Sequence, residues 1–132
     1  MIGKRNITML TQKSMVFKVF LDVNVLLDFL LKRKDFDEIK HVLLAAKKRQ
    51  VKLYASPSII QTVSYYLQQS YSAELSKALL IEILKIVNII ESSHETIHQA
   101  LNSSIDDIED AIHYFAAIRH KMDFVISSDK QF

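Results

Sequence analysis

Residues 16–28 read VFKVFLDVNVLLD, and this stretch decides the fold. Val16 to Leu21 is short, almost wholly apolar and rich in β-branched and aromatic residues, which is typical of a strand buried on both faces. Asp22 follows at the carboxyl end of this strand, and Val25 to Lys32 has the periodicity of a helix. A strand, an acid and then a helix is the unit from which parallel α/β sheets are built.

The same alternation continues along the chain. Further strands are predicted at Val51–Ala55, Val87–Ile90 and Phe124–Ile126, and the segments between them have helical periodicity. The predicted helices cover residues 36–49, 56–70, 73–86, 95–102 and 107–120. Because right-handed crossovers place helices on both faces of a parallel sheet, we expect a three-layer α/β/α sandwich with four to five short strands. We expect one domain over residues 15–132, preceded by a flexible extension over residues 1–14.

The composition is that of a globular protein. Of the 132 residues, 49% are hydrophobic and 24% are charged, which excludes a disordered chain. No apolar run reaches the roughly 18 residues that a membrane-spanning helix needs, and residues 1–14 are polar and basic, unlike a signal peptide. Cysteine is absent, which excludes disulfides and thiolate metal sites, so we expect a cytoplasmic protein without membrane association.

Carboxylates gather where the predicted strands end. Asp22 and Asp129 follow two of the strands, and Asp107 and Asp110 begin the helix that precedes the last strand. Ligand sites in such sheets lie beyond the carboxyl ends of the strands. We therefore expect Asp22, Asp110 and Asp129 to converge, with Asp107 in support. Ile108, Ala111, Ile112 and Phe115 of the same helix, whose apolar repeat continues to Ile118, are expected to face the core.

Carboxylates that converge repel one another and stay ionised together only when a cation neutralises them. An all-oxygen set of ligands suits Mg²⁺ or Mn²⁺ and predicts metal-dependent phosphodiester chemistry. The alternative is structural: acids in the first turn of a helix are stabilised by its dipole, and Asp22 is also placed to cap the helix that follows it.

Four segments, taken in order, resemble the PIN domain family. Residues 19–28 (VFLDVNVLLD) resemble its first strand and loop, and residues 55–67 (ASPSIIQTVSYYL) resemble the segment that carries its second acid. Residues 107–117 (DIEDAIHYFAA) are similar to its third-acid helix, and residues 126–132 (ISSDKQF) to its terminal segment. The resemblance covers roughly residues 16–132.

The resemblance implies a metal-dependent endoribonuclease of the VapC-like kind that cuts single-stranded RNA. Such proteins are often the toxin of a bacterial toxin–antitoxin pair and are usually dimeric, so it also implies an antitoxin partner and a homodimer. By motif position, Asp22, Asp110 and Asp129 would be metal ligands. Asn24 would order the loop of the first acid, and Ser127 stands at the position of a family threonine.

The sequence departs from the family pattern at the second acid. Thr62 stands six residues after Ser56, where an acid is expected. A hydroxyl carries no charge, so the ion would be held more weakly, or Asp107 would supply the missing carboxylate. The alternative is a PIN fold that no longer cuts and binds RNA or a protein partner. A phospho-receiver domain lacks support, because no acid pair follows the first strand.

The histidines are weaker candidates. His94 and His98 have i, i+4 spacing but no third ligand beside them, so we expect exposed helix-surface residues. For His113 and His120, two turns apart on the carboxylate helix, we expect solvated or partner-facing roles.

Overall fold

The computed structural model describes residues 16–33 and 36–127. Four strands are present in this part of the chain: β1 (Phe17–Leu21), β2 (Val51–Ala55), β3 (Val87–Ile89) and β4 (Phe124–Ile126). The helices between and around them are α2 (Val23–Leu30), α3 (Phe36–Lys47), α4 (Pro57–Ser70), α5 (Ala73–Leu84), α6 (His94–Leu101) and α7 (Ile108–Arg119). The predicted extension at residues 1–14 lies outside the described residues, and the division into an extension and one domain stays a prediction.

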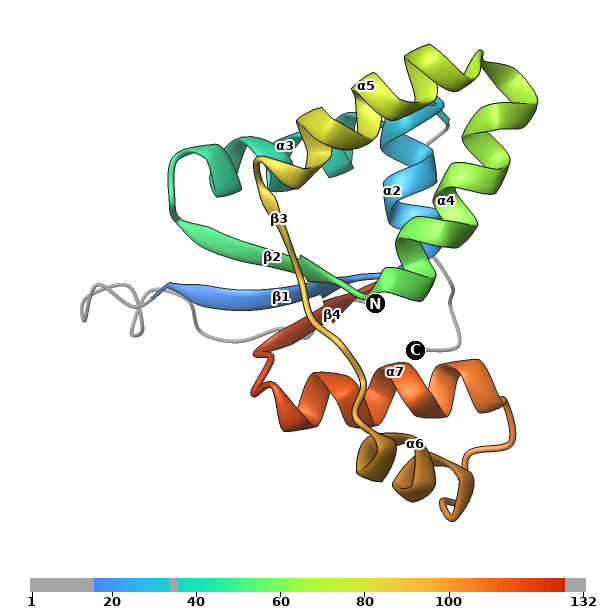
Figure 1. Ribbon diagram of the computed structural model, residues 1–132. Coiled ribbons are helices and arrows are strands. Elements are labelled where there is room, and N and C mark those ends of the chain that lie inside the picture. The colour runs from blue at the N-terminus through green and yellow to red at the C-terminus, as the bar shows by residue number, and fades with distance from the viewer. Residues whose placement is uncertain (1–15, 34–35, 128–132) are drawn as a thin grey trace.

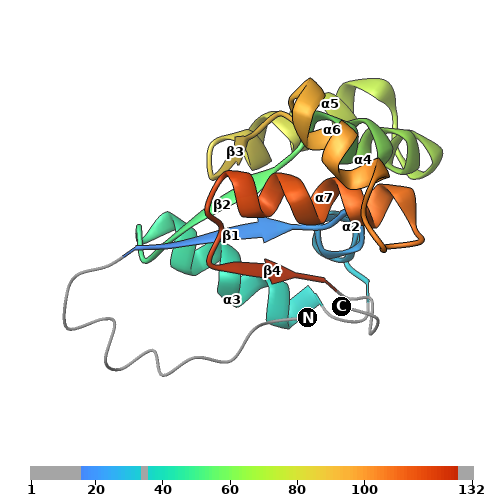
Figure 2. The same cartoon turned by 90° about the horizontal axis from the view of Figure 1, so that it is seen from below.

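The strands form one parallel sheet in the order β3-β2-β1-β4. Helices α2, α3, α4 and α5 cover one face of the sheet, and α6 and α7 cover the other (Figures 1 and 2). Strand β1 lies inside the sheet, with Val19 opposite Leu53 of β2 on one side and Phe124 of β4 on the other. The predicted α/β/α sandwich with a central parallel sheet is confirmed.

Polar side chains fix where the helices begin. At α2, α4, α5, α6 and α7, the residue before the helix accepts a hydrogen bond from the backbone N–H three residues later. These N-caps are Asp22, Ser56, Ser72, Ser93 and Asp107. Each satisfies a backbone donor that the helix itself leaves unpaired, which explains why the chain starts a helix at these points.

Cations stand where helices commonly end in glycine. Lys32, Arg49 and Lys121 follow α2, α3 and α7 with φ values of 52°, 60° and 57°, in the left-handed region. The conformation costs a residue with a side chain about 1–2 kcal/mol. Part of this cost is offset because a positive charge is favourable beside the carboxyl end of a helix.

The core lies mainly between the sheet and the layer of α2 to α5. Leu21, Leu26, Leu53, Ile59 and Leu67 are each 0% exposed. These residues come from β1, α2, β2 and α4, so the two inner strands and the helices above them share one apolar cluster.

The predicted core face of α7 is confirmed at Ala111 and wrong at Ile108. Ile108 and Ile118 are 59% and 53% exposed, and Ile112 and Phe115 are only half-buried. Besides Ala111, the helix buries His113, Ala116 and Ala117. Helix α7 lies against the sheet with α6 beside it (Figure 2), and small side chains allow this close approach where isoleucines would hold the helix away.

Across the described ranges, no helix is both long and apolar enough to cross a bilayer.

Ser76 provides a test of the packing beneath α5. Its side-chain oxygen is buried and has no hydrogen-bond partner in the described part of the chain. An unpaired buried hydroxyl costs about 1–3 kcal/mol, so we predict that Ser76→Ala raises the free energy of unfolding by about 1–2 kcal/mol in urea titrations.

The matched control is Ser64→Ala in α4, where the hydroxyl donates to the carbonyl of Gln61 at 2.7 Å. This variant gains the higher helix propensity of alanine, about 0.5 kcal/mol, but loses this exposed hydrogen bond, so its stability should change little. Equal gains at both positions would show that the Ser76 hydroxyl carries no penalty.

Candidate active site

The amino termini of three helices meet at the carboxyl end of the sheet. Helices α2, α4 and α7 all begin there (Figure 1), and their first turns line a cavity of about 400 Å³. The lining residues are Val23, Ser58, Ile59, Thr62, Ile108, Glu109, Ile112 and His113. The amino end of a helix carries about half a positive charge, so the cavity is suited to carboxylates and to a phosphate group.

Asp22 connects three elements at this end. Its Oδ1 accepts the N–H of Val25 at 2.9 Å, which caps α2, and its Oδ2 accepts the hydroxyl of Ser127 at 2.5 Å. Its own N–H donates to the carbonyl of Ile126 at 3.2 Å. A carboxylate offers about four acceptor positions, so both oxygens keep capacity for a further ligand while their direction is fixed.

The acids at the start of α7 are arranged differently from one another. Asp107 is exposed, and its Oδ1 accepts the N–H of Asp110 at 3.0 Å as the N-cap of the helix. Asp110 is half-buried, and Glu109 is exposed and lines the cavity. Asp107 therefore folds back over the helix end, and Glu109 is the carboxylate of this run that reaches the cavity wall.

His113 is a buried histidine of α7 at the same end of the sheet as these acids. It is only 9% exposed, and its ring packs against Phe20 of β1 with 5.7 Å between the ring centroids. Burial lowers the pKa of the imidazole, and nearby negative charges oppose this shift. The opposing carboxylates, from largest effect to smallest, are Glu109, Asp110, Asp22 and Asp107. Asp22 of the β1–α2 junction and Asp110 of α7 thus act on the same imidazole, although they are far apart in the sequence.

The predicted solvated role of His113 is wrong. The ring is buried because positions 113, 116 and 117 have the i, i+3, i+4 spacing of one helix face, and alanines occupy the other two. This spacing is the signal in the sequence that could have placed His113 against the sheet. His120, by contrast, is half-buried and its Nε2 lies 3.1 Å from the carbonyl oxygen of Glu91.

The remaining predicted residues have varied positions. Asn24 is exposed in the first turn of α2. Thr62 is exposed on α4, lines the cavity and donates its hydroxyl to the carbonyl of Ser58 at 3.0 Å. Asp129 lies outside the described residues. Within residues 16–33 and 36–127, no group of three or more metal-binding side chains is placed to hold an ion, so the convergence of Asp22, Asp110 and Asp129 stays a prediction.

A sequence profile described as the PIN domain matches residues 18–131, which is most of the chain. The chain belongs to the PIN domain family. No curated protein sequence matches it.

Solved structures share this PIN fold at low sequence identity. VapBC2 from Rickettsia felis, bound to a DNA fragment from its promoter, matches with a TM-score of 0.66 and 17% identity, over 88% of this chain and 91% of that chain. VapC20 from Mycobacterium tuberculosis, a toxin that cleaves the sarcin–ricin loop, matches with a TM-score of 0.65 and 11% identity, over 85% of this chain and 90% of that chain. At these identities the similarity shows the fold.

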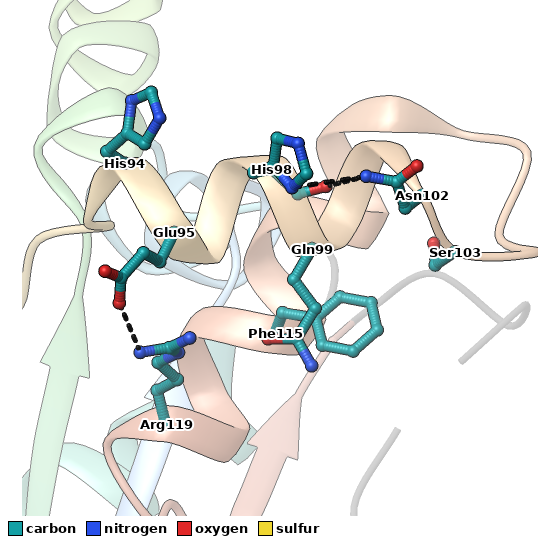
Figure 3. A pocket seen from close by; sticks show the side chains of 8 residues that line it. All are labelled: His94, Glu95, His98, Gln99, Asn102, Ser103, Phe115 and Arg119. Atoms are coloured by element: carbon teal, nitrogen blue, oxygen red, sulfur yellow. Dashed lines mark hydrogen bonds and ion pairs between the residues drawn. The ribbon is translucent and has the colours of Figure 1, made fainter.

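A second cavity of this PIN domain lies between α6 and α7. It has a volume of about 700 Å³ and includes His94, Glu95, His98 and Arg119 in its lining. Figure 3 shows both histidines on one side of α6, pointing away from Arg119. Both are exposed, as predicted, and the amide nitrogen of Asn102 donates to the carbonyl of His98 at 2.9 Å.

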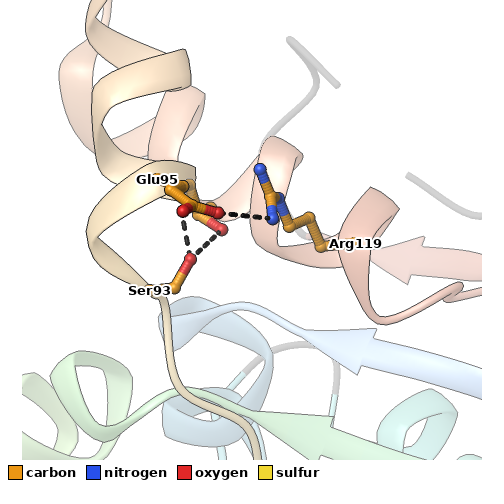
Figure 4. Close-up of polar contacts among 4 residues, drawn as sticks. Ser93, Glu95 and Arg119 are labelled. Carbon is orange, nitrogen blue, oxygen red and sulfur yellow. Dashed lines mark hydrogen bonds and ion pairs between the residues drawn. The ribbon is translucent and has the colours of Figure 1, made fainter.

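The contacts in this second cavity hold the two helices together. Glu95 of α6 lies 3.5 Å from Arg119 of α7, and Figure 4 shows this pair beside the cap residue Ser93. Ser93 accepts the N–H of Thr96 at 3.1 Å. Glu95 and Arg119 therefore pair with each other across α6 and α7. The cavity at the carboxyl end of the sheet is the better candidate for chemistry.

Replacing Ser127 tests how Asp22 is held. A hydrogen bond to a charged group stabilises the folded state more than one between neutral groups, but partial exposure reduces this contribution. We therefore predict that Ser127→Ala lowers the free energy of unfolding by about 1 kcal/mol. Ser127→Thr keeps the hydroxyl and should remain near wild type in the same chemical denaturation with EDTA. If the alanine variant is as stable as wild type, this bond does not hold the acid in place.

The buried imidazole predicts a specific pH dependence. The folded protein disfavours the charged form of His113, so the unfolded chain binds more protons between the lowered pKa and the ordinary value of 6.5. Stability should therefore be fully present above pH 6.5 and fall as the pH is lowered below it. The measurement is the free energy of unfolding from pH 8 to pH 5, and His113→Gln should flatten this slope.

The matched control for this experiment is His41→Gln on the exposed surface of α3, which should keep the wild-type slope. A His113→Gln variant that retains the full slope would contradict the assignment.

Proposed function

We propose that the chain is an endoribonuclease that cuts single-stranded RNA with Mg²⁺ or Mn²⁺, and that it is the toxin of a toxin–antitoxin pair. One observation carries this proposal: in a PIN domain, Asp22 and Asp110 both act electrostatically on one buried imidazole, which lines a cavity at the carboxyl end of the sheet. VapC20, a toxin of the same fold that cleaves the sarcin–ricin loop, adds support.

The donor groups suit a hard divalent ion. Mg²⁺ in proteins is commonly held by one or two carboxylates together with waters and substrate phosphates, and Asp22 and Asp110 can supply the two carboxylates. Asp129 is the proposed third ligand. The chemistry that a bound Mg²⁺ or Mn²⁺ supplies is polarisation of a phosphoryl oxygen and activation of water.

The chain's own residues orient this site. The N–H of Val25 and the hydroxyl of Ser127 fix both oxygens of Asp22, so the first acid needs no reorganisation when the substrate arrives. The amino ends of α2, α4 and α7 favour the negative phosphate. Asn24 is proposed to order the start of α2, and Asp107 supports the site by fixing the first turn of α7.

The proposed partners are an antitoxin and a second copy of the chain in a cytoplasmic complex. VapBC2 was solved with DNA from its promoter, which supports such a complex for a protein of the same fold. Helix α4 carries Tyr65 and Tyr66, whose side chains are 61% and 40% exposed. Neighbouring α5 carries exposed Leu75 and Ile81, and a protein partner would remove this apolar surface from water.

The direct test is cleavage of a fluorescent single-stranded RNA in Mg²⁺, in Mn²⁺ and in EDTA. We expect Asp22→Asn and Asp110→Asn each to slow cleavage about 100-fold or more, because each removes a charge that holds the ion. Asp106→Asn is the matched control, since this acid is exposed and does not line the cavity. Equal rates for wild type and Asp22→Asn would refute the assignment.

The second candidate function is a PIN fold that no longer cuts and serves as an RNA-binding or protein-binding module. Thr62 favours it, because a neutral hydroxyl bonded to the backbone of its own helix stands where the family's second acid is expected. Calorimetric titration with Mn²⁺ separates the two candidates. A nuclease should bind Mn²⁺ at millimolar or lower concentration in a way that Asp22→Asn abolishes, whereas a binding module should show no such site.

A further inference from the structure

A basic pocket lies at the amino end of the sheet, opposite the candidate active site. Its volume is about 570 Å³, and four cations line it: Lys47, Arg49, Lys52 and Lys85. They come from separate elements, since Lys47 ends α3, Arg49 lies in the turn before β2, Lys52 is in β2 and Lys85 caps α5. Figure 1 shows this end of the sheet, where α3 leads into β2 and α5 leads into β3.

The charges of the basic pocket are mostly uncompensated. Among the residues that the structure describes, no aspartate or glutamate lines it. Lys85 pairs with Glu82 at 3.0 Å, an exposed pair on α5. Lys47, Arg49 and Lys52 make no ion pair with any residue in the described part of the chain.

Helix ends explain only part of this arrangement. The carboxyl ends of α3 and α5 each contribute about half a negative charge, and cations are favourable there. After Glu82 and both helix ends are subtracted from the four cations, about two positive charges remain. Lys52 also lies on a strand, where no helix end calls for a cation.

Arg49 adds a second observation. It occupies the left-handed conformation after α3, with φ of 60°, where glycine is the usual residue. Lys32 and Lys121 take the same conformation at other helix ends, so the backbone alone does not single out Arg49. What distinguishes Arg49 is its position on the wall of a concave site that three other cations share.

We propose that the basic pocket binds backbone phosphates of single-stranded RNA, away from the point of cleavage. Like charges brought together in a concave site are neutralised by a polyanion, and phosphate contacts of this kind position a strand without reading its sequence. Val16, Val51 and Ile86 provide an apolar floor beside the cations, which suits the sugar and base surfaces of a single strand. Naming RNA as the polyanion rests on the proposed function.

The geometry allows one RNA strand to reach both sites. Strand β1 has five residues and separates the two ends of the sheet by roughly 17 Å. A strand that occupies the cavity beside Asp22 can therefore continue to the basic pocket.

The test measures RNA binding without cleavage. Fluorescence anisotropy in EDTA follows a labelled 16-nucleotide RNA and a 4-nucleotide RNA between 50 and 200 mM KCl, with the full chain. The test variant combines Arg49→Gly with Lys52→Gln. We expect its affinity for the long RNA at 50 mM salt to fall roughly tenfold, and the slope of log affinity against log salt to shrink by about 1.4, or about 0.7 per lost contact. The short RNA, which can occupy the basic pocket by itself, should also bind more weakly to the test variant.

The variants distinguish weaker RNA binding caused by the removal of positive charge from weaker binding caused by a less stable fold. Glycine relieves the left-handed backbone at position 49, so Arg49→Gly alone should raise the melting temperature while it weakens RNA binding. The matched control makes the same two chemical changes outside the pocket, Lys121→Gly in the turn after α7 and Lys77→Gln on α5, and should bind RNA as wild type does.

Three results would overturn the proposal. They are an unchanged affinity and salt slope in the test variant, an equal loss in the control, and poly-glutamate binding the pocket more tightly than RNA, which would indicate an acidic protein partner. This test does not depend on nuclease activity. A chain that binds RNA through these cations but never cuts it would refute the proposed enzyme, and the proposal that the basic pocket binds RNA would still hold.

Discussion

Asp22 after β1 and the acids in the first turn of α7 lie towards the carboxyl end of this sheet, where the positive ends of three helices also lie. This electrostatic balance is the constraint on which the site depends. The half charges at the starts of α2, α4 and α7 reduce the cost of keeping carboxylates ionised nearby. The imidazole of His113, which is buried and packs against Phe20, shows that the region is partly withdrawn from water, where charges act strongly.

The elements of the fold could be predicted from local patterns, and the site only in part. Strand β1 was predictable because every position but Lys18 is apolar, and α4 because Ser56 and Pro57 mark its start. The face that α7 buries was not, because hydrophobicity favours Ile108 and Ile118 while close packing favours Ala116 and Ala117. At this helix, close packing against neighbouring elements decided which face is buried, although the hydrophobic pattern favoured another face. The same packing buried His113.

Capping decides which acids are available for chemistry. Sequence spacing places Asp107 and Asp110 on one face of a helix, but Asp107 precedes the first turn and turns its carboxylate back to the N–H of Asp110. Glu109, which the dipole argument assigns to the helix end, reaches the cavity instead. Asp22 combines both uses, because one oxygen caps α2 while the other meets Ser127. Whether an acid caps a helix or faces the cavity depends on the cap geometry at single residues. The periodicity of the sequence does not show this geometry.

The pairing of β1 with β4 has a consequence for protein synthesis. The hydrogen bond between Ser127 and Asp22 joins residues that are 105 positions apart. A chain emerging from the ribosome can form the pair of β1 and β2 early, but Asp22 gains its second partner only after β4 has been made and has docked beside β1. Contacts between distant parts of a chain form late because the intervening loop must first be closed at a cost in entropy. A nascent chain therefore lacks the oriented carboxylate of Asp22 until β4 has been made and has docked, which delays any activity that depends on this carboxylate.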